Sequence, residues 1–299
     1  MEITLALGGG GSRGYAHVGV LRVLEREGFR IRAVAGTSAG GIIAALYAAG
    51  YSPEEMENRF LKLDAARLYS RDEEDGPGLL GLAGARRVLH ELLGERTFSD
   101  LRIPCALTAV DVRSGREVLL NDGLVVDAIL ATIAVPGVFP PKILGGHELV
   151  DGGVLDPVPV SVARHLAPAL PVVAVALTPR TEPAIDLEKL PLPVPLPIPI
   201  LRRLTQTRIA QAFRVFAASV DIGARMLTEL RLELEEPEVI IRPDVSHIGL
   251  LDQVDVADVI RRGERAAETA LPELRRSVSW VRRVRRRLFR RSQPKRLRL

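Results

Sequence analysis

The chain has 299 residues, of which 47% are hydrophobic and 26% charged, a composition that excludes wholesale disorder, collagen-like repeats and fibrous coiled coils. Its length allows one large domain or two small ones, and its single cysteine, Cys105, excludes an internal disulfide and a cysteine-cluster metal site. The formal net charge of +4 is unevenly distributed, because residues 274–299 hold 12 Lys or Arg and no acid, leaving 29 basic and 37 acidic residues in residues 1–273.

The first 50 residues alternate between short apolar runs and helical spacing. Residues 3–7 form an apolar run that stops at the glycines of residues 8–11, which predicts a buried strand. No basic residue precedes this run, so it is not typical of a signal peptide. A helix over residues 15–28, a strand over 31–35 and a small-residue helix over 41–49 follow. This order predicts a parallel sheet with helices on its faces.

Later elements are less sharply marked. We expect helices over residues 53–63, 85–93, 125–133, 204–232 and 254–271, and strands over 105–112, 117–120, 171–177 and 239–242. The acidic stretch 71–81 indicates an exposed loop, and the Ser114-Gly115 pair predicts a hairpin. Residues 191–200 alternate proline with large aliphatic residues, which requires an extended segment, either a substrate-facing flap or a rigid connector. We expect one domain, residues 1–273, and then a basic tail, residues 274–299.

A G-x-S-x-G pattern follows the second expected strand. It consists of Gly36, Thr37, Ser38, Ala39 and Gly40. The pattern requires a sharp turn from strand to helix that lifts the serine hydroxyl clear of the backbone. The strand over 31–35 and the helix over 41–49 supply this context, and the helix N-terminus favours negative charge near Ser38. A helix entry with Ser38 as N-cap is the alternative, but the context favours a nucleophile.

A glycine loop lies between the first expected strand and helix. It consists of Gly9, Gly10, Gly11, Ser12, Arg13 and Gly14. A dinucleotide fingerprint of this form would require an acidic residue about 20 positions later, where only Ala33, Val34 and Ala35 stand. We instead expect the loop beside Ser38 at the carboxyl edge of the sheet, with its N–H groups forming an oxyanion hole. A glycine turn without a ligand is the alternative.

A serine nucleophile requires a base, and no histidine is marked as one. His165 lies in an apolar helix-like stretch and His17 in the first expected helix, and both positions indicate structural residues. Nothing in the sequence around His247 distinguishes it. Asp151 ends an apolar run and precedes Gly152 and Gly153, which by itself indicates a β-turn.

These three motifs in this order resemble the patatin-like phospholipase family, and in particular its small bacterial single-domain members. The similarity extends from residue 2 to about residue 272, including residues 134–141 and 241–244. The resemblance implies a three-layer α/β/α sandwich with a mainly parallel central sheet.

The resemblance also implies a Ser-Asp dyad, with Ser38 as the nucleophile and Asp151 as its base. The N–H groups around Gly9, Gly10 and Gly11 would form the oxyanion hole, and Arg13 occupies the basic position of the loop. The implied function is a serine lipid acyl hydrolase or esterase of phospholipase A or lysophospholipase type, without a metal or organic cofactor. A catalytically silent lipid- or protein-binding module of the same fold and a dinucleotide-binding enzyme are the alternatives.

The basic tail bears on location. No apolar stretch approaches the about 18 residues of a membrane-spanning helix, so we expect a cytoplasmic protein. The tail interleaves arginines with apolar residues and would suit peripheral contact with the anionic inner membrane face. A solvated end and nonspecific nucleic-acid binding are the alternatives, and no specific nucleic-acid partner is expected.

Overall fold

The computed structural model describes residues 1–63, 68–71, 76, 78–178, 208–278 and 297–298. The proline-aliphatic segment 191–200 lies outside these residues. The same is true of the basic tail, apart from residues 274–278 and 297–298. The role of both segments therefore stays a prediction.

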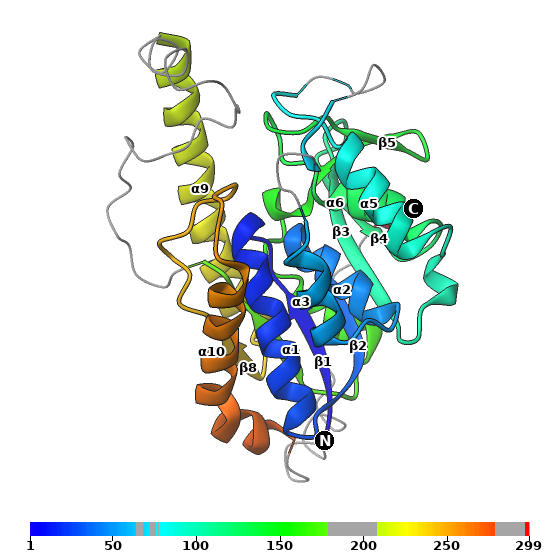
Figure 1. Cartoon of the computed structure of the whole chain (residues 1–299), viewed down its shortest axis with the longest axis vertical. Coiled ribbons are helices and arrows are strands. Elements are labelled where there is room, and N and C mark those ends of the chain that lie inside the picture. Colours follow the sequence, from blue (N-terminus) through cyan, green and yellow to red (C-terminus); the bar gives the residue numbers. More distant parts are fainter. Residues whose placement is uncertain (64–67, 72–75, 77, 179–207, 279–296, 299) are drawn as a thin grey trace.

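A nine-stranded sheet forms the middle layer of the molecule (Figure 1). Its strands are β1 (Glu2–Leu7), β2 (Arg30–Gly36), β3 (Cys105–Asp111), β4 (Arg116–Leu120), β5 (Lys142–Leu144), β6 (His147–Asp151), β7 (Val172–Val175), β8 (Val239–Ile241) and β9 (Leu297–Arg298). Hydrogen-bonded neighbours follow the path β5-β6-β3-β2-β1-β7-β8, with β4 paired to β3 and β9 paired to β4. Neighbouring strands along the path β3-β2-β1-β7-β8 are parallel, whereas β4 and β6 run antiparallel to β3.

Helices cover both faces of this sheet. They are α1 (Ala16–Arg26), α2 (Ala39–Ala48), α3 (Pro53–Phe60), α5 (Ala83–Leu93), α6 (Val125–Thr132), α7 (Val160–Leu166), α9 (Arg208–Glu235) and α10 (Val256–Ser277). Short 3-10 helices stand at η1 (Gly11–Tyr15), η2 (Phe98–Asp100) and η3 (Gly152–Val154). No helix in the described part of the chain has the length and hydropathy of a membrane span.

Strand β1 shows why the fold has three layers. Its alternate residues Ile3, Leu5 and Leu7 join one core with α1, α2 and α10, whereas Ala6 joins a second core with α7 and Leu232 of α9. Since successive strand residues point to opposite faces, both faces of the sheet are buried. The three-layer α/β/α fold expected from the sequence is confirmed.

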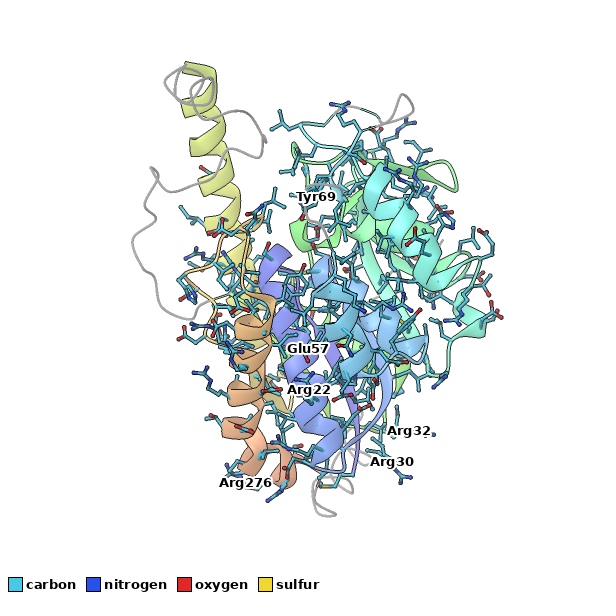
Figure 2. The ribbon with its side chains drawn as sticks, in the orientation of Figure 1. Arg22, Arg30, Arg32, Glu57, Tyr69 and Arg276 are labelled. Atoms are coloured by element: carbon cyan, nitrogen blue, oxygen red, sulfur yellow. The ribbon has the colours of Figure 1, made fainter. Side chains whose placement is uncertain are left out.

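Ion pairs tie the outer helices of one layer together. Arg22 of α1 donates to Glu57 of α3 and to Glu264 of α10, at 2.5 and 2.6 Å (Figure 2 labels Arg22 and Glu57). Both glutamates hold the pKa of Arg22 above its usual value. The guanidinium group therefore links three helices that are far apart in the sequence.

The β5–β6 hairpin and the end of α10 differ from the sequence prediction. The hairpin of β5 and β6 was not expected, because β5 has three residues and directly follows two prolines. Helix α10 continues through Pro272 to Ser277, six residues past its expected end. Leu274 and Ser277 are both fully buried, so packing against the core outweighs the hydrogen bond lost at Pro272.

Candidate active site

Strands β2 and β6 end against the same edge of β3. The pairing of β2 with β3 ends where Gly36 faces Leu107, and the antiparallel strand β6 places Asp151 opposite Ala109. The other edge of β3 is occupied by β4. Leu107 and Ala109 are two residues apart on β3, which corresponds to about 7 Å. The C-terminal ends of β2 and β6 therefore point toward each other across this short gap. This geometry brings Ser38 beside Asp151.

Ser38 has the backbone conformation of a nucleophile elbow. Its φ and ψ are 54° and −126°, in a region that costs a residue with a side chain about 1–3 kcal/mol. The Ser38 N–H donates to Thr132 Oγ1 at 2.9 Å, and the Ser38 carbonyl accepts from the Gly41 N–H at 2.8 Å. Since α2 begins at Ala39, the G-x-S-x-G segment forms the strand, turn and helix that the pattern requires.

The two glycines of this pattern are required by close backbone packing. A Cβ atom on Gly40 would lie 2.2 Å from the Leu7 carbonyl oxygen, and one on Gly36 would lie 2.5 Å from the Gly40 carbonyl oxygen. No larger residue fits at either position without moving the backbone. The turn can therefore close only with glycine on both sides of Ser38.

Thr37 connects the elbow to the rest of the site. Its hydroxyl donates to the Asp156 carbonyl oxygen at 2.8 Å and accepts from the Thr108 hydroxyl at 2.7 Å. The Asp156 carboxylate is fully buried and pairs with Arg231 of α9 at 2.9 Å. Helix α9 is thus anchored to the segment that carries Ser38.

Asp151 is a buried carboxylate in contact with Ser38. It is 5% exposed and accepts a hydrogen bond from the Gly153 N–H at 2.7 Å. Burial raises the pKa of Asp151 to about 6, although the neighbouring Ser38 hydroxyl and the Gly153 N–H both favour the ionised form. The carboxylate is therefore mostly ionised at neutral pH and able to accept a proton.

The glycine loop, residues 9–14, packs directly on the elbow, as the sequence predicts. A Cβ atom on Gly9 would lie 3.1 Å from Ser38 Cβ, and one on Gly14 would lie 2.6 Å from Ala39 Cβ. The loop thus lies over Ser38 and over Ala39, the first residue of α2.

The N–H groups of the loop are not equivalent. The Gly9 N–H, one of the oxyanion donors expected from the sequence, donates to the Pro157 carbonyl oxygen at 3.0 Å. Among the described residues, the N–H groups of Gly10 and Gly11 donate to no backbone carbonyl. These two groups are therefore the candidate donors to an oxyanion.

Two buried side chains hold the loop in place. Arg13 is 7% exposed and donates through Nε to the Ile248 carbonyl oxygen at 2.5 Å, and burial lowers its pKa. His17 Nε2 lies 2.8 Å from the Gly8 carbonyl oxygen, and burial lowers the pKa of His17 to about 4. A neutral His17 therefore donates to the loop, which is a structural role.

The other histidines lie elsewhere. His90 pairs with Glu95 and His147 with Asp111, whereas the side chains of His165 and His247 are exposed. The pKa of the buried Asp151 is shifted by burial, by Ser38 and by Gly153, and no histidine contributes.

The structure adds supporting residues that the sequence does not mark. Thr108, Thr132, Asp156 and Arg231 contact the elbow or its neighbours from four separate parts of the chain. Each is a common residue type without a local motif, so no sequence signal distinguishes them.

A model of the patatin-like phospholipase family matches residues 5–164, which include the glycine loop, the elbow and Asp151. The chain belongs to this family. Its fold is therefore that of a patatin-like phospholipase domain.

Known proteins of the family align with most of the chain. An uncharacterized NTE family protein of Mycobacterium tuberculosis is 35% identical over 163 residues, which are 54% of this chain and 45% of that protein. A second such protein of this species is 32% identical over 292 residues, covering 91% of this chain and 47% of its own length. The chain thus spans about half the length of the curated relatives it matches. The crystal structure of VipD from Legionella pneumophila shares the fold, with a TM-score of 0.58, 13% identity, and coverage of 90% of this chain and 66% of that one.

The pKa of Asp151 predicts the pH dependence of activity. We expect kcat/KM for a soluble ester to rise about tenfold per pH unit below pH 6 and to level off above about pH 7, because the base must be ionised. Initial rates across this range, with unfolding monitored by circular dichroism at each pH, measure the effect. A profile that is flat from about pH 4 upward would contradict the raised pKa.

The backbone of Ser38 predicts an effect on stability. Ser38→Gly should have a free energy of unfolding about 1 kcal/mol higher than Ser38→Ala, because glycine adopts a positive φ without strain. Both variants lack the hydroxyl, so denaturant unfolding of the pair isolates the backbone term. Equal stability of the two variants would show that residue 38 is unstrained.

Proposed function

We propose that this patatin-like phospholipase domain is a serine acyl hydrolase that cleaves carboxylic esters of lipids. The observation that carries the proposal is the placement of Ser38, at a strained elbow, beside the buried Asp151, whose pKa it lowers. The family to which the chain belongs supports a lipid as the substrate.

The proposed reaction proceeds in two halves. Ser38 Oγ attacks the ester carbonyl carbon while Asp151 takes the hydroxyl proton. The tetrahedral intermediate collapses, the alcohol leaves with the proton from Asp151, and an acyl group remains on Ser38. A water molecule then attacks the acyl carbon while Asp151 takes its proton. Return of this proton to Ser38 releases the fatty acid.

Charge stabilisation would come from the glycine loop. The N–H groups of Gly10 and Gly11 are the donors proposed for the oxyanion, and such a donor contributes about 3–4 kcal/mol to the transition state. The raised pKa of Asp151 supports its role, because a more basic carboxylate accepts the serine proton more readily.

Phospholipids or lysophospholipids are the proposed substrate class. The family match supports this class, and the sequence of the basic tail supports a cytoplasmic protein that meets the inner membrane face. The preferred head group and acyl chain length of the substrate are to be determined by experiment.

Profiling of released fatty acids tests the proposal. Intact protein should release fatty acids from a mixture of phospholipids, lysophospholipids and triacylglycerols, with the phosphate-bearing lipids cleaved faster, and Ser38→Ala protein should release none. Absence of release from every lipid and from soluble esters would indicate a catalytically silent binding module.

A further inference from the structure

Helix α9 pairs its arginines on the side toward the body and exposes a row of aliphatic side chains on the other side. On the face toward the body, Arg225 pairs with Asp221 at 2.6 Å, and Arg231 pairs with both Asp156 and Glu235 at 2.9 Å. The outer face exposes four aliphatic side chains, each four residues from the next: Ile222, Met226, Leu230 and Leu234, here called the outer α9 stripe. A surface helix normally shows the reverse arrangement, so the stripe indicates an interaction surface.

One end of the stripe lies beside the active site. Arg13, in the glycine loop, interacts electrostatically with Asp221 and Arg225, which neighbour Ile222 on α9. Figure 1 shows this part of α9 rising along the body toward the end of the sheet at which β1 and β2 finish. Leu234, about 18 Å along the helix from Ile222, adjoins Glu235, which accepts from the Ser161 N–H of α7 and pairs with Arg231, so this end of the stripe lies against the body. The stripe therefore runs from the level of the Arg231–Asp156 pair past the active-site edge, with Ile222 and Met226 toward its projecting end.

Exposed aliphatic side chains also occur across the active-site edge. Val154 follows Asp151 by three residues and is 44% exposed, and Ile143 of β5 is 62% exposed. Figure 1 shows β5 at the same end of the molecule as the projecting part of α9, on the other side of the sheet. Apolar side chains thus flank the edge that carries Ser38 on both sides.

We propose that Ile222 and Met226 insert into the surface of a phospholipid bilayer and seat the active-site edge on it. The proposal rests on the proposed function, because the lipid layer would both cover the aliphatic side chains and supply the ester. A protein docked on this edge would instead stand between substrate and Ser38.

Charge attraction is not the driving force at this surface. The exposed residues among those described on α9 between 219 and 235 include Glu233 and no Lys or Arg. Binding through the stripe therefore depends on apolar burial and persists at high salt, unlike binding through a basic segment.

Co-sedimentation with phosphatidylcholine vesicles tests the proposal. The full chain carries Ser38→Ala so that no lipid is consumed, and the buffer contains about 1 M NaCl, which screens exposed charges beyond about 3 Å. We expect the double variant Ile222→Gln/Met226→Gln to bind at least about tenfold more weakly than its parent. Leu234→Gln is the matched control, because it removes the more exposed aliphatic group (77%) from the distant end of the stripe and should change binding less than about twofold.

The catalytic arm uses the same substitutions with Ser38 intact. The double variant should hydrolyse a soluble ester at the parent rate and vesicle phospholipid at least about tenfold more slowly. Unchanged vesicle binding by the double variant, or an equal loss with Leu234→Gln, would overturn the proposal. The proposal would also be overturned if the parent were a dimer and the double variant a monomer, because the stripe would then join two copies of the chain. If the parent fails to hydrolyse the soluble ester, the proposed function is refuted. The membrane-insertion proposal is still tested in that case, because vesicle binding is measured without catalysis.

Discussion

Replacing Ser38 by alanine should abolish turnover of a chromogenic short-chain ester, with a loss of at least about 10³-fold. The hydroxyl lies beside the buried Asp151, and the glycine loop packs on the same serine. The same variant should lose labelling by a fluorophosphonate, which reacts with activated serines. Because alanine keeps the Cβ atom and the Thr132 contact is made by the backbone, the fold should survive.

Circular dichroism and the melting temperature of Ser38→Ala provide the folding control. Ser12, which lies in the glycine loop and whose N–H donates to Leu250, provides the matched serine control. Ser12→Ala should keep both labelling and turnover. Labelling that persists in Ser38→Ala would move the nucleophile to another residue.

Replacing Asp151 by asparagine should lower kcat by about 10³- to 10⁴-fold. Asparagine has the same shape and can still accept hydrogen bonds from Ser38 and Gly153, but it cannot take a proton at neutral pH. His165→Gln and His247→Gln, which alter exposed side chains, should change kcat less than about twofold. A histidine variant as inactive as Ser38→Ala would replace the proposed dyad by a triad.

The stability of Asp151→Asn separates loss of chemistry from loss of fold. The folded-state pKa of Asp151, about 6, exceeds its ordinary value of 3.8, so the folded protein binds this proton more tightly than the unfolded chain does. The carboxyl therefore lowers stability progressively as the pH rises from about 4 to about 6, by about 2–3 kcal/mol in total. We expect Asp151→Asn to be at least as stable as the parent at pH 8, and its advantage to shrink toward pH 4. A variant that unfolds at pH 8 would contradict this electrostatic cost.

Local patterns in the sequence were sufficient to predict the elbow. The strand, the five-residue G-x-S-x-G segment and the small-residue helix are consecutive, so their spacing alone indicates the turn that Ser38 occupies. The neighbouring glycine loop follows from the same logic, because β1 and β2 are adjacent parallel strands whose carboxyl ends lie at one edge.

Asp151 could not be placed by local reasoning. Its position depends on β6 pairing with β3 just beyond the end of β2, a contact between segments about 40 residues apart along the chain. The sequence does not mark the short β5–β6 hairpin that carries Asp151, and the Asp-Gly-Gly sequence by itself indicates only a β-turn. Only the resemblance to the patatin-like family linked it to Ser38.

The hydrogen bonds of the glycine loop could not be predicted from the sequence either. Pro157 accepts the Gly9 N–H across nearly 150 residues, and this long-range contact decides which N–H groups remain for an oxyanion. The exposed aliphatic stripe of α9 could not be predicted from the sequence for the same reason. Its arginines face the body only because they pair with residues of other elements, such as Asp156.

Trapping of the acyl-enzyme tests the central proposal most directly. The protein is mixed with a chromogenic ester, quenched in acid during turnover and analysed by intact mass and peptide mapping. We expect a mass increase of one acyl group located on Ser38, and no such adduct in Ser38→Ala. Acylation of a different residue, or steady turnover with no adduct at Ser38 when deacylation is the slow step, would contradict the proposed mechanism.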